Sequence, residues 1–163
     1  MPFPIEDVLV NRKVAKVTLR GVRDKPGIAA IIFEELSSRG VNVEMIVTGA
    51  SAKGRTDIAF LVLESQIERI REIEEELLQA IDARDLSIDR KVALIVFYGG
   101  SEMAKTPGVA ARIFNILAEA GVNIEMISTS IDSLSLVVRE NRIEEAIFAI
   151  GENLGIEPRE EYF

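Results

Sequence analysis

The segment Pro26-Gly27-Ile28-Ala29-Ala30-Ile31-Ile32-Phe33 recurs as Pro107-Gly108-Val109-Ala110-Ala111-Arg112-Ile113-Phe114, and this repeat is the main evidence for the fold. A second stretch, Gly40-Val41-Asn42-Val43-Glu44-Met45-Ile46, returns as Gly121-Val122-Asn123-Ile124-Glu125-Met126-Ile127. Both pairs are 81 residues apart (107 − 26 and 121 − 40), so no insertion separates the two stretches. The chain therefore contains two copies of one structural unit.

Outside these stretches the match continues with small changes of offset. Arg12-Lys13-Val14-Ala15 recurs as Arg90-Lys91-Val92-Ala93, 78 residues later (90 − 12). The loop that leads to Pro107 is therefore three residues longer than its counterpart (81 − 78). Such differences fall between elements, where folds tolerate them.

Each copy has the pattern strand, helix, strand, strand, helix. In the first copy we expect strands over residues 14–21, 41–48 and 56–64, with a helix between the first two that ends at Gly40. The apolar face of that helix is predicted to hold Ala29, Ile32, Phe33 and Leu36, and its counterpart Ala110, Ile113, Phe114 and Leu117.

The second helix of each copy is expected to begin at a capping box, formed by Ser65 with Glu68 and by Asn141 with Glu144. The first of these helices directs an apolar face towards the sheet: Ile67, Ile70, Ile73, Leu77, Leu78 and Ile81. Its Glu74-Glu75-Glu76 run is interpreted as the solvated outer face. The pattern predicts ferredoxin-like α+β units, each an antiparallel sheet with both helices on one face. The other face of each sheet must be covered by a second sheet. This requirement favours side-by-side packing of the units and a homodimer.

Composition excludes several classes of function. The 163 residues carry a formal net charge of −8, with no basic block, which argues against nucleic acid and anionic membranes as partners. Neither a membrane-spanning run nor a signal peptide is present in the sequence, so we expect a cytoplasmic protein. With no Cys and no His, we expect no catalytic residue, no metal site and no cofactor. A small acidic enzyme that uses Asp24 or Glu44 is the alternative from this class.

The turn Asp24-Lys25-Pro26-Gly27 is the first candidate for binding. Gly27 lets a ligand approach the free backbone N–H groups of a helix N-terminus, which suit the carboxylate of an amino acid. Asp24 could accept a charge-assisted hydrogen bond from the α-ammonium group. In the alternative interpretation, Pro26 and Gly27 only start the helix and Asp24 only caps it.

Two asparagines and two glycine-containing segments complete the candidates. Asn42 and Asn123 stand among apolar residues, so we expect buried amides that need partners in backbone, water or ligand. The segment 49–56 resembles a phosphate-binding loop but has Arg55 where Lys is required, and a strand follows it, so we interpret it as a hairpin loop. Gly99-Gly100-Ser101 is interpreted as a flexible segment.

Taken together, Asp24-Lys25-Pro26-Gly27, Val41-Asn42-Val43-Glu44-Met45-Ile46 and Asn123-Ile124-Glu125-Met126-Ile127-Ser128-Thr129-Ser130 resemble the tandem ACT domains of aspartate kinases. The resemblance covers residues from about 14 to 155. It implies two βαββαβ ACT domains, placed at 1–85 and 86–163, with the first able to borrow a strand from the tail at Glu161-Tyr162-Phe163.

The resemblance also implies feedback control of an aspartate kinase by free threonine, by lysine or by both, with the kinase catalytic domain or subunit as partner. The residues it implies for the effector site are Asp24, Lys25, Pro26, Gly27, Ile28, Ala29 and Thr48, with Asn123 and Ile124 from a second chain. Those it implies for a second effector site are Asn42, Val43, Gly108, Val109, Ala110, Ser128 and Ser130.

Because the sequence departs from the family pattern at two places, the resemblance does not identify which amino acid is the effector. Thr48-Gly49 stands where the family usually has Gln-Asn, and Ile131-Asp132-Ser133-Leu134-Ser135 replaces the usual Glu-Ile-Arg-Ile-Ser. The alternative function is an ACT-domain sensor of amino acids that regulates another biosynthetic enzyme.

Overall fold

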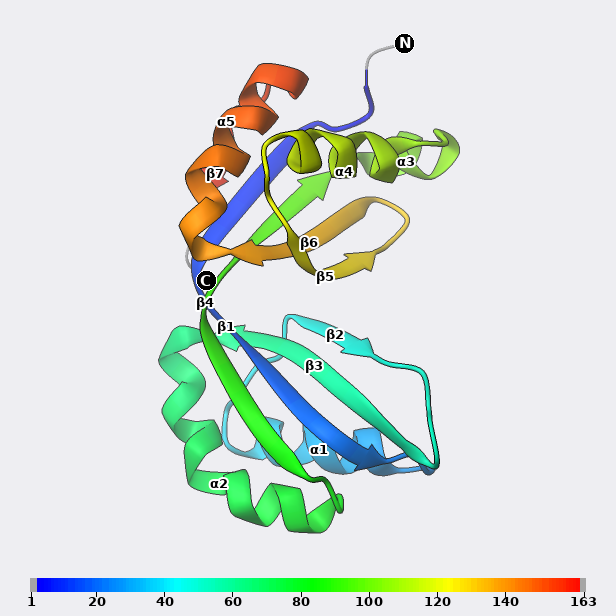
Figure 1. Cartoon of the computed structure of the whole chain (residues 1–163), viewed down its shortest axis with the longest axis vertical. Coiled ribbons are helices and arrows are strands. Elements are labelled where there is room, and N and C mark those ends of the chain that lie inside the picture. The colour runs from blue at the N-terminus through cyan, green and yellow to red at the C-terminus, as the bar shows by residue number, and fades with distance from the viewer. Residues whose placement is uncertain (1–2, 162–163) are drawn as a thin grey trace. The chain divides into compact units, whose positions relative to one another are not determined.

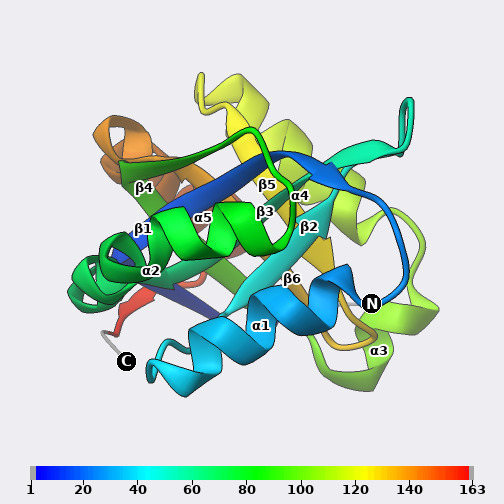
Figure 2. The same cartoon turned by 90° about the horizontal axis from the view of Figure 1, so that it is seen from below.

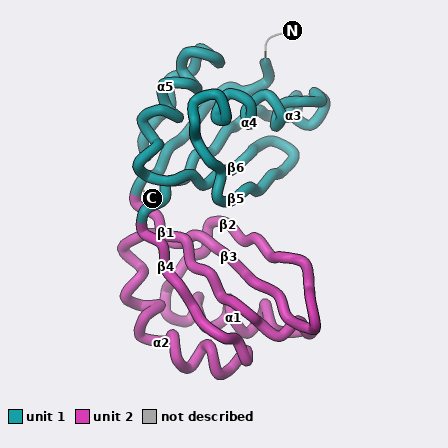
Figure 3. Tube along the Cα trace, viewed as in Figure 1, with its two compact units in different colours: residues 1–12, 91–163 teal, residues 13–90 magenta. Residues whose placement is uncertain are grey.

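The structure is a computed structural model that describes residues 3–161, and it divides into two compact units. Residues 13–90 form one unit from a continuous stretch of chain, here called the continuous unit. Residues 1–12 and 91–163 form the other, here called the split unit, which joins both ends of the chain (Figure 3). Each unit is described by itself.

The continuous unit contains the first copy of the repeat. Its elements are β1 (Asp7–Arg23, of which this unit holds 13–23), α1 (Ile28–Ser38), β2 (Met45–Thr48), β3 (Arg55–Leu63), the 3-10 turn η1 (Glu64–Gln66), α2 (Ile67–Ala80) and the first part of β4 (Asp85–Tyr98). The strand order is β2-β3-β1-β4, and β3 is antiparallel to both β1 and β2. Helices α1 and α2 lie on the same side of these strands (Figure 2).

The core of the continuous unit lies between its two helices and its sheet. Every second residue of β3 enters it, as Ile58, Phe60 and Val62. The ring of Phe33 on α1 meets the ring of Phe60 edge to face, with centroids 5.7 Å apart. Burial of each large apolar side chain contributes about 1.5–3 kcal/mol, so this cluster supplies most of the stability of the unit. The helices contribute these buried residues: Ile28, Ile32, Leu36, Ile67, Ile70, Ile73 and Leu77.

The split unit contains the second copy. After β4 come α3 (Gly100–Lys105), α4 (Val109–Glu119), β5 (Ile124–Thr129), β6 (Ser133–Arg139), the turn η2 (Glu140–Arg142), α5 (Ile143–Leu154) and β7 (Arg159–Glu160) (Figure 1). The strand order is β1-β4-β6-β5, and β6 is antiparallel to β4 and β5. Residues from both ends of the chain share one core, which includes Val8 and Val10 of β1 and Ile150 of α5.

Both units therefore have the ferredoxin-like strand order, with the fourth strand next to the first. This confirms the predicted α+β class, with antiparallel strand pairs and two main helices in each unit. The fourth strand of the continuous unit is the start of β4, and that of the split unit is the start of β1.

The division of the chain differs from the expected domains 1–85 and 86–163. Residues 1–12 lie in the unit that contains the second copy, and residues 86–90 lie in the unit that contains the first. The C-terminal tail pairs within its own unit, because Arg159 of β7 lies beside Leu9 in a parallel pair and the N–H of Glu161 donates to the carbonyl of Val10 at 3.0 Å. Tyr162 and Phe163, named with Glu161 as a strand to be borrowed, lie outside the described residues.

Two expectations about helix starts were wrong. Neither α2 nor α5 has a side-chain cap, because a 3-10 turn precedes each helix and places the expected caps Ser65 and Asn141 inside that turn. Gly99-Gly100-Ser101 is not a flexible segment, because Gly100 and Ser101 begin helix α3.

Several finer details of the pattern also differ. Strand β2 begins at Met45 and not at Val41, although Val41 is buried as expected. On α1 the buried face is shifted by one residue at its start, so that Ile28 is buried and Ala29 is exposed. Among the described residues no helix is long and apolar enough to cross a membrane.

We expect that deletion of residues 1–12 unfolds the split unit and leaves the continuous unit folded. The deletion removes Ile5, Val8 and Val10 from the core and exposes the unpaired edge of β4. Loss of three buried aliphatic side chains costs roughly 5 kcal/mol or more, which is comparable with the whole stability of a small domain. Hydrogen exchange should show lost protection in α4, α5 and β6, with protection kept in α1 and α2. Unchanged protection of β6 would contradict the assignment of the N-terminal strand.

Candidate functional site

A pocket of about 470 Å³ lies at the end of the continuous unit where β1 gives way to α1. Strand β3 lies between β1 and β2, so the end of β1, the end of β2 and the start of β3 meet at this edge of the sheet. In register, Val22 of β1 lies opposite Thr56, and Thr48 of β2 lies opposite Ile58. The pocket is lined by Arg23, Asp24, Lys25, Pro26, Gly27, Ile28, Ala29, Thr48, Gly49, Thr56 and Ile58.

All seven residues predicted for the effector site within the first copy line this one pocket: Asp24, Lys25, Pro26, Gly27, Ile28, Ala29 and Thr48. Thr48 is separated from the turn by α1 and most of β2, and the sheet brings it there. The alternative in which Asp24 caps the helix is wrong, because no side chain in the described part of the chain caps α1.

The N-terminus of α1 presents backbone donors to the pocket. Gly27 is the N-cap residue and has a φ of 92°, a left-handed conformation that a glycine adopts without strain. The N–H of Ile31 donates to the carbonyl of Gly27 at 3.1 Å, whereas no described residue accepts a hydrogen bond from the N–H of Ala29 or Ala30. These donors, together with the positive end of the helix dipole, form a favourable place for a carboxylate.

The pocket lining contains two basic residues, Arg23 and Lys25, and one acidic residue, Asp24. Asp24 is exposed, and its carboxylate forms no hydrogen bond or ion pair with another described residue. Its main-chain N–H donates to the carbonyl of Gly54 at 2.9 Å, which ties the turn to the β2–β3 hairpin. The carboxylate is therefore held in place by its backbone while its oxygens stay available to a ligand.

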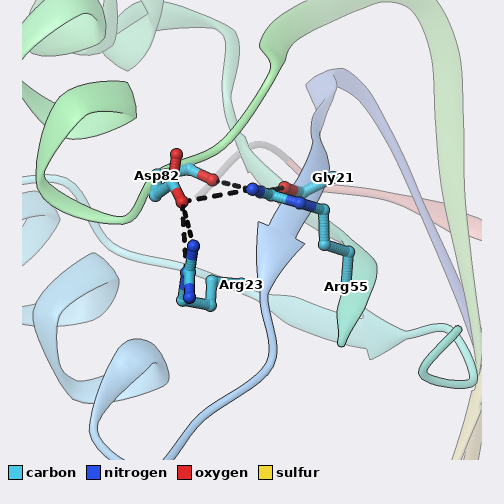
Figure 4. A network of polar contacts seen from close by, with 4 residues as sticks. All are labelled: Gly21, Arg23, Arg55 and Asp82. Carbon is cyan, nitrogen blue, oxygen red and sulfur yellow. Dashed lines mark hydrogen bonds and ion pairs between the residues drawn. The ribbon is translucent and has the colours of Figure 1, made fainter. Parts of the chain in front are cut away.

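Arg23, which precedes Asp24, is bound to a carboxylate outside the pocket. Its Nη2 lies 2.9 Å from Oδ2 of Asp82, and Nη2 of Arg55 lies 3.1 Å from the same oxygen (Figure 4). Arg55 also donates through Nη1 to the carbonyl of Gly21 at 2.6 Å. Hydrogen bonds from Arg23 and Arg55 lower the pKa of the Asp82 carboxyl below its usual value. This network joins the turn that contains Asp24, the start of β3 and the turn that precedes β4.

The wall opposite the helix consists of Thr48, Gly49, Thr56 and Ile58, of which only Thr48 was predicted. The hydroxyl of Thr56 donates to the carbonyl of Gly49 at 2.8 Å, which closes the base of the hairpin. Counting the register of the β2–β3 hairpin outward from Lys53-Gly54 pairs Thr48 with Ala59, whereas the structure pairs Thr48 with Ile58. The positions of Thr56 and Ile58, like those of Arg23 and Asp82, therefore have no signal in the sequence.

The other two residues of the predicted effector site, Asn123 and Ile124, lie in the split unit at the start of β5. Asn123 and its counterpart Asn42 are both exposed, so the expectation of buried amides was wrong. Asn42 donates from its side chain to Oε1 of Glu44 at 2.9 Å, and its main-chain N–H donates to Oε1 of Gln66 at 3.3 Å. Its position outside a regular strand allows this exposure.

The residues predicted for a second effector site belong to both units. Asn42 and Val43 lie between α1 and β2 in the continuous unit. Gly108, Val109 and Ala110 begin α4, and Ser128 and Ser130 lie at the end of β5 in the split unit. The Ser130 hydroxyl is already used within its hairpin, with Oδ1 of Asp132 and Oγ of Ser133 both at 2.8 Å.

The two copies differ at the position that matters most. Gly108 repeats the left-handed N-cap of Gly27, with a φ of 87°. The counterpart of Asp24, however, is Lys105 (24 + 81), which forms an ion pair with Glu102. The turn of the second copy therefore has the helix N-terminus without the carboxylate that could bind an ammonium group.

A larger cavity, of about 650 Å³, lies in the split unit beside Phe3, Ile5 and Gly99. It contains none of the predicted site residues, and its wall is mainly apolar. Among residues 3–161, no group of three or more acidic side chains is placed to hold a metal ion.

The ACT domain family matches residues 17–77 and 96–154 of this chain. An aspartate kinase of Pseudomonas fluorescens is 36% identical over 146 residues, which cover 90% of this chain and 35% of that protein. The regulatory subunit of aspartate kinase from Thermus thermophilus is 32% identical, with a TM-score of 0.84, and the match covers 91% of this chain and 97% of that one. A structure of aspartokinase alpha and beta subunits gives the same identity and coverage, with a TM-score of 0.82. The chain thus spans about a third of the length of the curated relatives and nearly all of the regulatory subunit.

The lowered pKa of Asp82 makes the stability of the continuous unit depend on pH. The folded state favours the carboxylate, so its contribution is present above about pH 4, the pKa of an unperturbed Asp, and is lost as the pH falls through the lower folded pKa. We expect the urea midpoint of Asp82→Asn to lie below that of the wild type at neutral pH and to converge with it once the pH has fallen below the folded pKa of Asp82. Glu34→Gln, on the exposed face of α1, serves as the control. A difference that persists unchanged at low pH would exclude the ion pairs as its cause.

Proposed function

The chain belongs to the ACT domain family, as found in the regulatory region of aspartate kinases, and we propose that it senses a free amino acid in the pocket beside Asp24. It acts as a regulatory module and performs no catalysis by itself. The proposal rests on one observation: the carboxylate of Asp24, which has no partner among the described residues, lines the same pocket as the N-terminus of α1.

The two main-chain charges of an amino acid match the two halves of this pocket. The α-carboxylate receives hydrogen bonds from the N–H groups of Ala29 and Ala30, for which no other acceptor is described. The α-ammonium group donates to Asp24, whose carboxylate has no other described partner. Charge-assisted hydrogen bonds of this kind contribute about 1.5–3 kcal/mol each, so together they suffice for binding in the micromolar to millimolar range.

The lining residues favour a neutral side chain on the ligand. Asp24 is the single acidic lining residue, so the second ammonium group of lysine would find no carboxylate in this pocket. Both cations of the lining, Arg23 and Lys25, would repel it. The hydroxyls of Thr48 and Thr56 and the apolar side chain of Ile58 suit a small side chain with a hydroxyl and a methyl group. Threonine is therefore the effector that we assign to this pocket.

Asn123 and Ile124 of a second copy close the pocket in this proposal, which makes the module a homodimer. A second site, which would take lysine, would use Asn42 and Val43 with Gly108, Val109, Ala110, Ser128 and Ser130. The absence of an acidic residue at Lys105 means that this second site must draw an acid from elsewhere to bind an ammonium group.

The kinase activity itself belongs to a catalytic domain or subunit that would accompany this module in the cytoplasm. An effector that binds the inhibited arrangement more tightly by about 1–3 kcal/mol shifts the equilibrium between arrangements by roughly 5- to 150-fold. The Arg23–Asp82 ion pair connects the pocket to the turn before β4. Binding of the effector can therefore change the structure outside the pocket through this ion pair.

Thermal unfolding against a panel of free amino acids tests the proposal. Threonine at about a hundred times its dissociation constant should stabilise the fold by ~2.7 kcal/mol, which raises the midpoint by several degrees. Lysine alone should give a smaller shift, because its side chain has no acidic partner in the pocket.

Asp24→Asn should abolish the response to threonine, because an amide cannot accept the charge-assisted bond. Glu34→Gln, which removes one negative charge from the exposed face of the neighbouring helix, should leave the response intact. A full response in Asp24→Asn would remove Asp24 from the site, and no response of the wild type to either amino acid would refute the proposed effectors.

A further inference from the structure

A second hollow of the continuous unit, of about 420 Å³, adjoins the amino-acid pocket. The two share Gly49 and Thr56, the pair that closes the base of the β2–β3 hairpin. The hollow is lined by Gly21, Gly49, Ala50, Ala52, Lys53, Arg55, Thr56, Asp57 and Arg84. Lys53, Arg55, Asp57 and Arg84 of this lining have no part in the proposed amino-acid site.

The hollow is positively charged in a chain of formal net charge −8. Lys53, Arg55 and Arg84 face one acidic residue, Asp57. The carboxylate of Asp57 is itself engaged, because Oδ1 accepts a hydrogen bond from the N–H of Gly21 at 2.9 Å. Cations concentrated in a concave site attract anions more strongly than the same charges spread over a surface.

Arg84 is positioned for such a role by Gly21. A side chain at residue 21 would meet Cγ of Arg84 at 2.7 Å and Cδ at 2.8 Å, so the absence of one lets Arg84 lie across the backbone of β1. The main-chain N–H of Arg84 donates to the carbonyl of Arg20 at 2.8 Å, which fixes the start of its side chain. Within residues 3–161, no carboxylate lies within ion-pair distance of its guanidinium group.

The backbone of Lys53 and the side chain of Arg55 are also held in place. Lys53 and Gly54 have φ values of 54° and 73° at the tip of a two-residue hairpin, closed by the N–H of Ala52, which donates to the carbonyl of Arg55 at 2.8 Å. Positive φ at both central residues is what a tight hairpin turn requires. Arg55 is anchored to Gly21 and Asp82, as Figure 4 shows, whereas Lys53 has no side-chain partner among the described residues.

We propose that this hollow is a binding site for a small molecule that carries a phosphate group. Two unpaired cations, Lys53 and Arg84, approach it from the hairpin and from the α2–β4 turn, and a phosphate dianion neutralises both. A single carboxylate would neutralise only one of them. Arg84 supplies the planar pair of donors that suits phosphate oxygens, and Lys53 supplies a mobile point charge. The volume exceeds that of inorganic phosphate, which leaves room for an organic group attached to it.

Binding of inorganic phosphate to the purified full chain tests the proposal without identification of the natural ligand. Phosphate should raise the thermal midpoint by several degrees more than sodium chloride of the same ionic strength, because a specific site binds the folded state whereas screening acts on all surface charges. A phosphomonoester such as glycerol phosphate should bind at least as tightly as inorganic phosphate if the additional volume is used.

Arg84→Gln should weaken phosphate binding by about tenfold or more, measured by calorimetric titration, because it removes a charge-assisted pair and keeps the two carbons that pack over Gly21. Lys53→Gln should weaken it several-fold. Arg39→Gln, which removes an exposed cation at the far end of α1, should leave it unchanged. Equal shifts with phosphate and sodium chloride, or equal affinities in Arg84→Gln and Arg39→Gln, would overturn the proposal.

These outcomes are independent of the amino-acid site. The threonine response requires Asp24, which does not line this hollow, and Arg84 does not line the amino-acid pocket. Arg84→Gln should therefore lose phosphate and keep threonine, whereas Asp24→Asn should do the reverse.

Discussion

The first strand of each repeat must be paired along both of its edges, and the arrangement of the other elements follows from this requirement. Each first strand lies between two neighbours, and the repeat itself supplies only one of them, β3 for β1 and β6 for β4. The missing neighbour comes from the other repeat's long strand, the start of β4 in the continuous unit and the start of β1 in the split unit. An unpaired edge would expose a row of backbone donors and acceptors. The chain therefore uses its N-terminus to complete the unit that contains its second half.

The candidate site follows from the same strand order. With β3 between β1 and β2, the turn after β1 and the end of β2 are brought to one edge of the sheet, so Asp24 and Thr48 line one pocket. Both repeats end this turn with a left-handed glycine, because the backbone must reverse before the helix begins. Duplication has kept that geometry and changed the chemistry, since Lys105 stands at the position of Asp24.

Charges at this edge of the continuous unit are arranged in two groups. Asp82 binds Arg23 and Arg55 and thereby leaves Asp24 as a free carboxylate in the amino-acid pocket. Lys53 and Arg84, which have no carboxylate partner among residues 3–161, face the neighbouring hollow. Gly49 and Thr56 line both hollows, so they separate the proposed amino-acid site from the proposed phosphate site. This division of charge depends on the pairing of Asp82 with Arg23 and Arg55, residues that are far apart in the sequence.

From the sequence alone follow the repeat, the α+β class, most of the apolar faces of the helices and the Asp24-Lys25-Pro26-Gly27 turn of the candidate pocket, because these depend on local periodicity and on residues a few positions apart. The sequence did not determine that residues 1–12 belong with 91–163, since a strand's partner is set by long-range hydrogen bonding that leaves no local pattern. The expected capping boxes failed for a related reason: Ser65 and Asn141 have the right spacing, but the chain leaves each preceding strand through a 3-10 turn. Only the tertiary structure placed Thr56 and Ile58 beside Thr48, joined Arg23 to Asp82 and laid Arg84 over Gly21. Those contacts depend on the three-dimensional packing of elements, and the spacing of residues along the chain does not encode them.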